Sequence, residues 1–353
     1  MTLPNPLCAV LWSALFLPER LLGGWPVRAF PALVCFLGAW TLLTKPSPWE
    51  TRQPAREAVL VFLWLQAFYV TSYAYSSAFN GIRTGFRDLL DLPRYALAAV
   101  SAAYLIRHFD VQVRKSLDAA LAAVLYASLL AVAVGSRSLS LFADSDHVGY
   151  VMTLTFLYFL FFSCDRLRFA HAAAALPVVF LTGSRAAWSA SAFVLSLYLA
   201  ALLYQRLRRS RAKDHAAALS AAFFVAWAGA LVFGGWIKLG AAASAVEAMT
   251  YIRQSPLFGW GPAAYEPMSS LGNQYQRWLL RGGALGSATL LLGLVLVVFR
   301  LLRAVHGHWR LRLGAVAFLG AVALMLGSGP FLEDFRLMSL TAFLVAGIHE
   351  DAR

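Results

Sequence analysis

Arg185 occupies a position in the sequence that favours binding of an anion. It lies in the segment LTGSRAAW, residues 181–188, directly before a long apolar run. Ser184 is a good N-cap residue, so the run is expected to begin as a helix with Arg185 in its first turn. The helix macrodipole is positive there, and an exposed cation costs about 0.3–1 kcal/mol. An anion held between Arg185 and the free first-turn amides would reverse the sign of this effect.

A second group of basic residues lies in the stretch 238–281, which separates two apolar runs. Residues 241–254 predict a short helix that ends before Ser255 and Pro256, because proline disfavours a helical residue before it. The segment LFGWGP that follows predicts a tight turn, which places an aromatic ring at the height of a membrane interface.

A second short helix is expected from about Asn273, with the sequence NQYQRWLLRGG. Helical spacing puts Gln274, Arg277 and Arg281 on one face. One interpretation is an interfacial amphipathic helix with its basic face toward the lipid headgroups. The other is a site for a phosphate or pyrophosphate group, which arginine recognises well. The neighbouring face carries Tyr275, Trp278, Leu279 and Gly282.

His147 is the candidate general base. It lies in ADSDHVGY, residues 143–150, beside Asp144 and Asp146 and at the start of another apolar run. A carboxylate next to a histidine could orient the imidazole for proton transfer. The same residues are also explained as the polar beginning of a helix, where aspartates interact favourably with the macrodipole.

The composition of the chain identifies the environment in which these residues act. Of 353 residues, 60% are hydrophobic and 13% are charged, and the mean hydropathy is +0.65. Soluble domains are about 45–50% apolar and about 25% charged. This excludes a soluble enzyme, a disordered tail and a disulfide scaffold. Uninterrupted apolar runs such as residues 282–299 favour helices over the alternating strands of a barrel.

Several ligand classes are not expected. The net charge is +13, but the basic residues lie between apolar runs and not along one stripe, so nucleic acid is not a predicted partner. Cys8, Cys35 and Cys164 are far apart, and there is no CxxC or Cys/His cluster, so no metal site or cofactor is predicted. No basic residue precedes Arg20, which favours a retained first helix over a cleaved signal peptide.

The predicted fold is therefore an all-α polytopic membrane protein with a single transmembrane domain, residues 1–353. A spanning helix needs about 20 mostly apolar residues, and about twelve runs qualify. They cover residues 6–22, 28–44, 58–78, 92–107, 117–135, 147–163, 169–183, 185–204, 216–237, 282–302, 311–329 and 335–349. The runs that meet at residues 183–185 leave the count at eleven or twelve.

The distribution of basic residues predicts the orientation. More of the thirty Lys and Arg residues fall in the loops after even-numbered runs and at the C-terminus, which places both termini in the cytoplasm. The stretch 238–281 then forms a large outer loop. Its basic residues could snorkel at helix ends or bind an anionic ligand at the outer leaflet.

Three ordered segments resemble the O-antigen ligase/polymerase superfamily of bacterial inner-membrane proteins. They are LTGSRAAW, SPLFGWGP (residues 255–262) and GNQYQRWLLRGGALG (residues 272–286). The resemblance covers about residues 140–300 by motif and the whole chain by topology. It implies a GT-C-like fold and a metal-independent glycosyltransferase that acts on undecaprenyl-pyrophosphate-linked glycans at the outer side of the bacterial inner membrane.

The resemblance also implies roles for individual residues. Arg185 matches the arginine of the family's TGSR segment and would contact the pyrophosphate. The outer-loop residues Arg253, Arg277 and Arg281 could join it, although only the loop matches and not each residue. Asn273 corresponds to the second residue of a family His-Asn pair. The aromatic residues that could stack on sugars are Trp260, Tyr265, Tyr275 and Trp278.

The sequence departs from the family pattern at two places. Gly272 stands where the family histidine is expected, and residues 239–246 lack the usual basic residue. The missing histidine favours a polymerase of O-antigen, capsule or exopolysaccharide repeat units over a ligase that transfers the glycan to lipid A core or another acceptor. A transporter or lipid flippase is the alternative from another class. The implied partners are the lipid-linked glycan, its acceptor, the bilayer, and a chain-length regulator or flippase.

Overall fold

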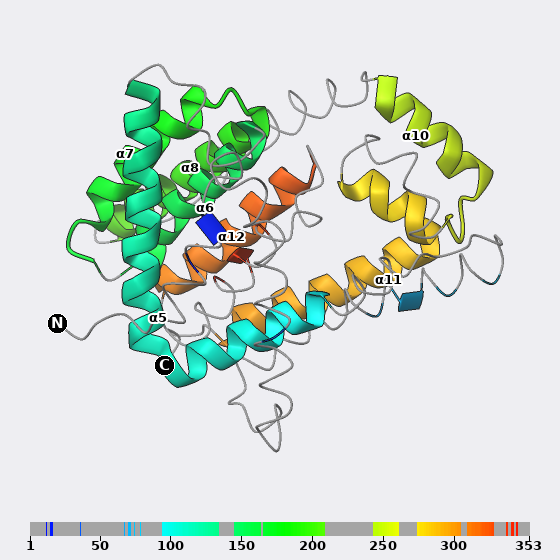
Figure 1. Cartoon of the computed structure of the whole chain (residues 1–353), viewed down its shortest axis with the longest axis horizontal. Helices are drawn as coiled ribbons and strands as arrows, with labels where there is room; N and C mark the ends of the chain where they lie inside the picture. The colour runs from blue at the N-terminus through cyan, green and yellow to red at the C-terminus, as the bar shows by residue number, and fades with distance from the viewer. Residues whose placement is uncertain are drawn as a thin grey trace.

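The computed structural model describes residues 94–133, 145–163, 165–208, 243–260, 274–304 and 309–327, with a few single helical positions nearer both ends. All regular elements among these residues are α-helices, as predicted, and none of these residues forms a strand. The helices are α5 (Arg94–Ala133), α6 (Ser145–Phe161), α7 (Arg168–Leu181), α8 (Arg185–Arg208), α10 (Ala243–Gln254), α11 (Gln274–Ala304) and α12 (Trp309–Leu326). Figure 1 shows their arrangement.

Helix α6 is the centre of the bundle. It contacts α5, α7, α8 and α12, and every residue from Val148 to Ser163 is buried. The sequence explains this position, because after its first turn α6 is hydrophobic on all sides and has no face suited to water. The polar groups among these residues bond within the bundle. The hydroxyl of Thr155, for example, donates to the carbonyl of Val151 at 2.8 Å.

Helix α5 corrects one sequence-based boundary. Residues 92–107 and 117–135 were expected as two spans joined by a loop, but residues 94–133 form one continuous helix. The physical reason is that this segment contains neither glycine nor proline, so no helix-breaking residue separates the two apolar runs. In Figure 1 the ribbon of α5 turns sharply part-way, between a cyan first part and a blue-green second part.

Two described helices are long and apolar enough to cross a membrane, Arg114–Ala133 within α5 and Arg185–Leu203 within α8. Helix α7 is apolar but has only 14 residues, a length of about 21 Å. Helices α6, α7, α8 and α12 lie within a few residues of their predicted bounds. The predicted runs 6–22, 28–44, 58–78, 216–237 and 335–349 lie outside the described residues, apart from single helical positions.

Candidate functional site

The TGSR segment forms the predicted capped helix start. Helix α7 ends at Leu181, and Gly183 has φ of +69°, a left-handed conformation that glycine adopts without strain. Ser184 then accepts a hydrogen bond on its Oγ from the backbone N–H of Ala187, at 3.4 Å. Arg185 is the first residue of α8 and its side chain is exposed. The N-cap prediction is confirmed.

The start of α6 packs directly against this turn. A Cβ added at Gly149 would lie 2.8 Å from Cβ of Ala187 and 3.0 Å from Cβ of Ser184. One turn later, the Thr153 hydroxyl lies 3.2 Å from the carbonyl of Ala187 and 3.0 Å from the Ser191 hydroxyl. Helices α6 and α8 are therefore parallel and begin side by side, with small residues between them.

This packing places the helix starts that carry His147 and Arg185 next to each other. His147 lies in the first turn of α6, half-buried, with its ring edge-on to Tyr150 at 6.3 Å between centroids. Asp146 is in the same first turn, as the helix-dipole interpretation predicts, while Asp144 lies outside the described residues. Within the described part of the chain, no side chain pairs with the Arg185 guanidinium.

The second group begins with the turn after α10. Helix α10 ends at Gln254, directly before Ser255 and Pro256, as predicted. The Ser255 hydroxyl donates to the carbonyl of Gly259 at 2.9 Å, and the Gly259 N–H donates back to the Ser255 carbonyl at 3.1 Å. Gly259 has φ of +72°. The predicted tight turn is therefore confirmed for residues 255–260.

Helix α11 is broken at Gly283, which has φ of +61° and ψ of −165°. The break separates the predicted short helix, residues 274–282, from the apolar residues that follow. The turn 255–260 docks into this break. The Trp260 N–H donates to the Leu280 carbonyl at 2.6 Å, and the N–H groups of Ala284 and Leu285 donate to the carbonyls of Pro256 and Leu257 at 2.8 and 3.1 Å.

We call this arrangement of residues 255–260 and 280–285 the glycine clasp. A Cβ added at Gly259 would lie 2.5 Å from the Gly283 nitrogen, and one added at Gly283 would lie 2.3 Å from the carbonyl carbon of Leu257. Only glycine allows the two backbones to approach this closely. The clasp therefore fixes the angle at which residues 274–282 leave the apolar part of α11.

The clasp helix, residues 274–282, carries two arginines that are buried rather than exposed. Arg277 and Arg281 are only 4% and 7% exposed. The interpretation of this face as basic and turned toward lipid headgroups is therefore wrong. The physical reason is that the helix is held inward at both ends, by the clasp and by a 2.8 Å hydrogen bond from the Tyr275 hydroxyl to the Ala323 carbonyl in α12.

The aromatic residues proposed as sugar platforms are largely engaged in this packing. Trp278 is 2% exposed and belongs to the core, so it is not available to stack on a sugar. The Trp260 indole N–H donates to the Tyr251 carbonyl at 2.9 Å, and its ring packs against Ile252 and Leu280. Tyr275 is half-buried, and burial raises the pKa of its phenol.

The remaining predicted residues are placed as follows. Arg253 is exposed in the last turn of α10, where a cation interacts favourably with the helix dipole. Asn273, Gly272 and Tyr265 lie outside the described residues. Helices α10 and α11 contact each other, whereas α6 and α8 contact each other, and α12 contacts both groups. The predicted site residues thus form two groups, one at the starts of α6 and α8 and the other on α10, the turn 255–260 and the clasp helix.

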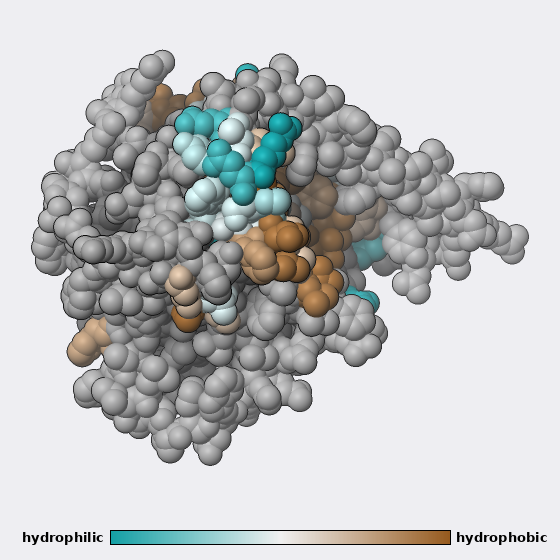
Figure 2. All heavy atoms as spheres, turned by 90° about the vertical axis from the view of Figure 1, so that its right-hand side faces the viewer, coloured by the Kyte–Doolittle hydropathy of each residue, from teal (hydrophilic) through white to brown (hydrophobic). Residues whose placement is uncertain are grey.

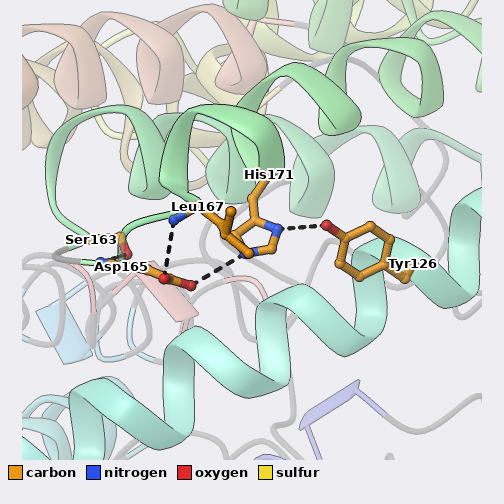
Figure 3. A network of polar contacts seen from close by, with 5 residues as sticks. All are labelled: Tyr126, Ser163, Asp165, Leu167 and His171. Atoms are coloured by element: carbon orange, nitrogen blue, oxygen red, sulfur yellow. Dashed lines mark hydrogen bonds and ion pairs between the residues drawn. The ribbon is translucent and has the colours of Figure 1, made fainter.

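A polar network at the other end of α6 was not predicted (Figure 3). Nδ1 of the His171 ring lies 2.8 Å from the Tyr126 hydroxyl, and its Nε2 lies 3.3 Å from a carboxylate oxygen of Asp165. The backbone N–H of Leu167 and the His171 side chain hold the pKa of Asp165 below its usual value. The sequence offered one signal for this network, a histidine among apolar residues, but its partner Tyr126 lies 45 residues away in the sequence. The network joins α5 to the α6–α7 turn.

No protein-family model matches the chain, and no curated protein matches it by sequence. The family resemblance therefore depends on the motif residues themselves. Among the described residues, each of the three motifs has a glycine with positive φ, namely Gly183, Gly259 and Gly283.

Proposed function

We propose that this protein is a membrane glycosyltransferase that polymerises undecaprenyl-pyrophosphate-linked oligosaccharides into O-antigen, capsule or exopolysaccharide. The observation that carries the proposal is the exposed Arg185 at the capped start of α8. A cation is unfavourable at this end of a helix unless an anion accompanies it. A pyrophosphate would supply that anion, and the three resembling motifs support this choice of ligand.

The chemistry requires stabilisation of a leaving pyrophosphate. The acceptor hydroxyl oxygen forms a bond to the anomeric carbon, the bond from that carbon to the pyrophosphate oxygen breaks, and the hydroxyl proton passes to a base. Arginines can stabilise the charge that develops on the leaving group. In this proposal Arg185 has that role from the start of α8, and His147, on the neighbouring start of α6, is the candidate base.

The proposal places the chain in the bacterial inner membrane, with about twelve spans, both termini cytoplasmic and residues 238–281 outside. The all-helical described residues and the two apolar helices of spanning length support a polytopic, GT-C-like fold. The expected partners are the lipid-linked glycan, its acceptor, the bilayer, and a chain-length regulator or flippase.

Two other functions remain as alternatives. A ligase that transfers the finished glycan to lipid A core or another acceptor would use the same motifs, but Gly272 replaces the expected histidine. A transporter is favoured by one observation, the break at Gly283 in α11, because discontinuous helices form transporter binding sites. Such transporters have broken helices in corresponding positions of two halves of the chain. Among the described helices, only α11 contains non-helical backbone angles, so these helices do not provide the second break of such a pair.

The test is complementation of a deletion strain, with surface glycan and lipid-linked intermediates separated by size on a gel. In the deletion strain, long chains should collapse to single repeat units. Arg185→Ala should fail to restore them although the protein inserts normally. The matched control is Arg166→Ala, which removes an exposed arginine between α6 and α7 and should complement fully.

Other gel patterns would support the alternatives. Long chains that persist on the lipid carrier while the final acceptor stays bare would indicate a ligase. Unchanged glycan and lipid-linked pools would refute both glycosyltransferase functions and favour a transporter.

A further inference from the structure

The outer side of the glycine clasp is apolar and exposed. Leu257 and Phe258, in the turn, are 56% and 49% exposed, and Leu285, the second residue after the break, is 52% exposed. The Leu285 N–H donates to the Leu257 carbonyl, so these side chains project from adjoining backbone. Further along α11, Leu291, Leu292 and Val295 are also exposed. The apolar surface of this helix therefore extends onto the turn.

A polar surface begins immediately before the turn. The last residues of α10, Arg253 and Gln254, are exposed, as is Glu247 two turns earlier. On the face of the molecule that α10 occupies, Figure 2 shows hydrophilic residues directly beside a hydrophobic patch. Exposed side chains thus change from polar at Arg253 and Gln254 to apolar at Leu257 and Phe258, although Met249, earlier in α10, is also exposed. Such a sharp change is typical of the boundary between water and hydrocarbon.

The backbone of the turn is also suited to a lipid environment. Irregular backbone is costly in lipid because each unsatisfied N–H or C=O group costs several kcal/mol. Here the carbonyls of Ser255, Pro256 and Leu257 accept hydrogen bonds from Gly259, Ala284 and Leu285, respectively. The bonds from Ala284 and Leu285 also satisfy two of the N–H groups left open where the second part of α11 begins.

We propose that Pro256, Leu257 and Phe258 insert into the hydrocarbon edge of the outer leaflet, where lipid acyl chains cover them together with Leu285. Lipid is the occupant that the structure favours, because the patch is continuous with the exposed apolar surface of a helix of the membrane domain. The insertion sets the height of the clasp helix and holds Arg281 close to the leaflet surface. This inference depends on the membrane fold but not on the glycosyltransferase activity.

The test measures depth in the full-length protein reconstituted into phosphatidylethanolamine/phosphatidylglycerol vesicles. Cys8, Cys35 and Cys164 are first replaced by alanine. Single cysteines are then introduced as Leu257→Cys, Phe258→Cys, Leu285→Cys and Gln254→Cys and labelled with an environment-sensitive fluorophore. Each label is challenged with lipids that carry a nitroxide on the acyl chain and, separately, with iodide on both sides of the membrane.

The labels at positions 257 and 258 should behave like the label at 285, with quenching by acyl-chain nitroxide several-fold stronger than quenching by iodide. The label at 254 should show the reverse preference. Iodide quenching at 257 and 258 as strong as at 254 would overturn the proposal, because the turn would then lie in water. Protection from both quenchers would also overturn it, because protein would then cover the patch. Positions 257 and 258 are probed in separate variants, so the test can still be made if one of the two variants misfolds.

Discussion

The arginines of the two groups differ in burial, and this difference determines what each can do. Arg185 is exposed and has no described side-chain partner, so its removal should affect ligand binding and leave the fold intact. Arg277 and Arg281 are almost fully buried, and a buried guanidinium must be compensated by partners inside the protein. Removing either of them disturbs those partners as well as any ligand contact.

Arg281→Ala should therefore lower both stability and activity, whereas Arg185→Ala should lower activity alone. Loss of one member of a buried charged contact costs about 3–5 kcal/mol, while an exposed substitution usually changes stability by about 0.5 kcal/mol or less. Thermal unfolding in detergent, measured beside glycan synthesis, checks this. If Arg281→Ala unfolds at the wild-type temperature, the arginine does not have a packed environment in solution.

Asp165 should stabilise the α6–α7 turn in a pH-dependent way. Its pKa is lowered from 3.8 in the folded protein, first by the backbone N–H of Leu167. The contribution of the carboxylate is therefore present above pH 3.8 and is lost as the pH falls through the lower folded pKa. Asp165→Asn should be less stable than wild type at pH 7, and the two unfolding temperatures should converge in strong acid. A constant difference at all pH values would contradict this.

At the scale of elements, the glycine clasp connects the turn after α10, residues 255–260, to the break in α11, residues 280–285. Three backbone hydrogen bonds and the close approach of Gly259 and Gly283 hold the turn against both parts of α11. The clasp determines where Arg281 lies, because a Cβ at Gly259 would meet the Arg281 carbonyl at 2.6 Å. The two glycines therefore act on the site through the arginine backbone.

Gly283→Ala should destabilise the protein more than Gly183→Ala. Both glycines have positive φ, so both substitutions cost about 1–3 kcal/mol in backbone strain. At Gly183 an added Cβ meets nothing within 4 Å, whereas at Gly283 it meets the Leu257 backbone at 2.3 Å. Only Gly283→Ala must also open the clasp. Equal losses of unfolding temperature in the two variants would show that the clasp contributes no packing.

At the scale of the whole molecule, local signals in the sequence predicted local features well. The Ser184 cap, the end of α10 before Pro256 and the turn at Gly259 all follow from neighbouring residues, and the structure has each of them. The ends of α6, α7, α8 and α12 were also close to prediction, because hydrophobic runs define them.

The features that prediction missed depend on contacts between distant segments. Helical periodicity placed Arg277 and Arg281 on one face, but it could not say that the clasp and α12 would bury that face. The Asp165–His171–Tyr126 network includes a residue of α5 that lies 45 positions from His171 in the sequence. The continuity of α5 was missed because two separate apolar runs suggested two helices, although no glycine or proline lies between them. The sequence motifs thus predicted local turns and helix ends, and tertiary packing determined how exposed their side chains are.

Helix α12 has a consequence for how the two groups of residues influence each other. It packs against α6, α8 and α11, and near its end the Ala323 carbonyl accepts a hydrogen bond from the Tyr275 hydroxyl. A shift of this helix would therefore change the separation between Arg185 and the buried arginines. If a ligand at one group displaced α12, the geometry of the other group would change with it, although the two groups need not touch.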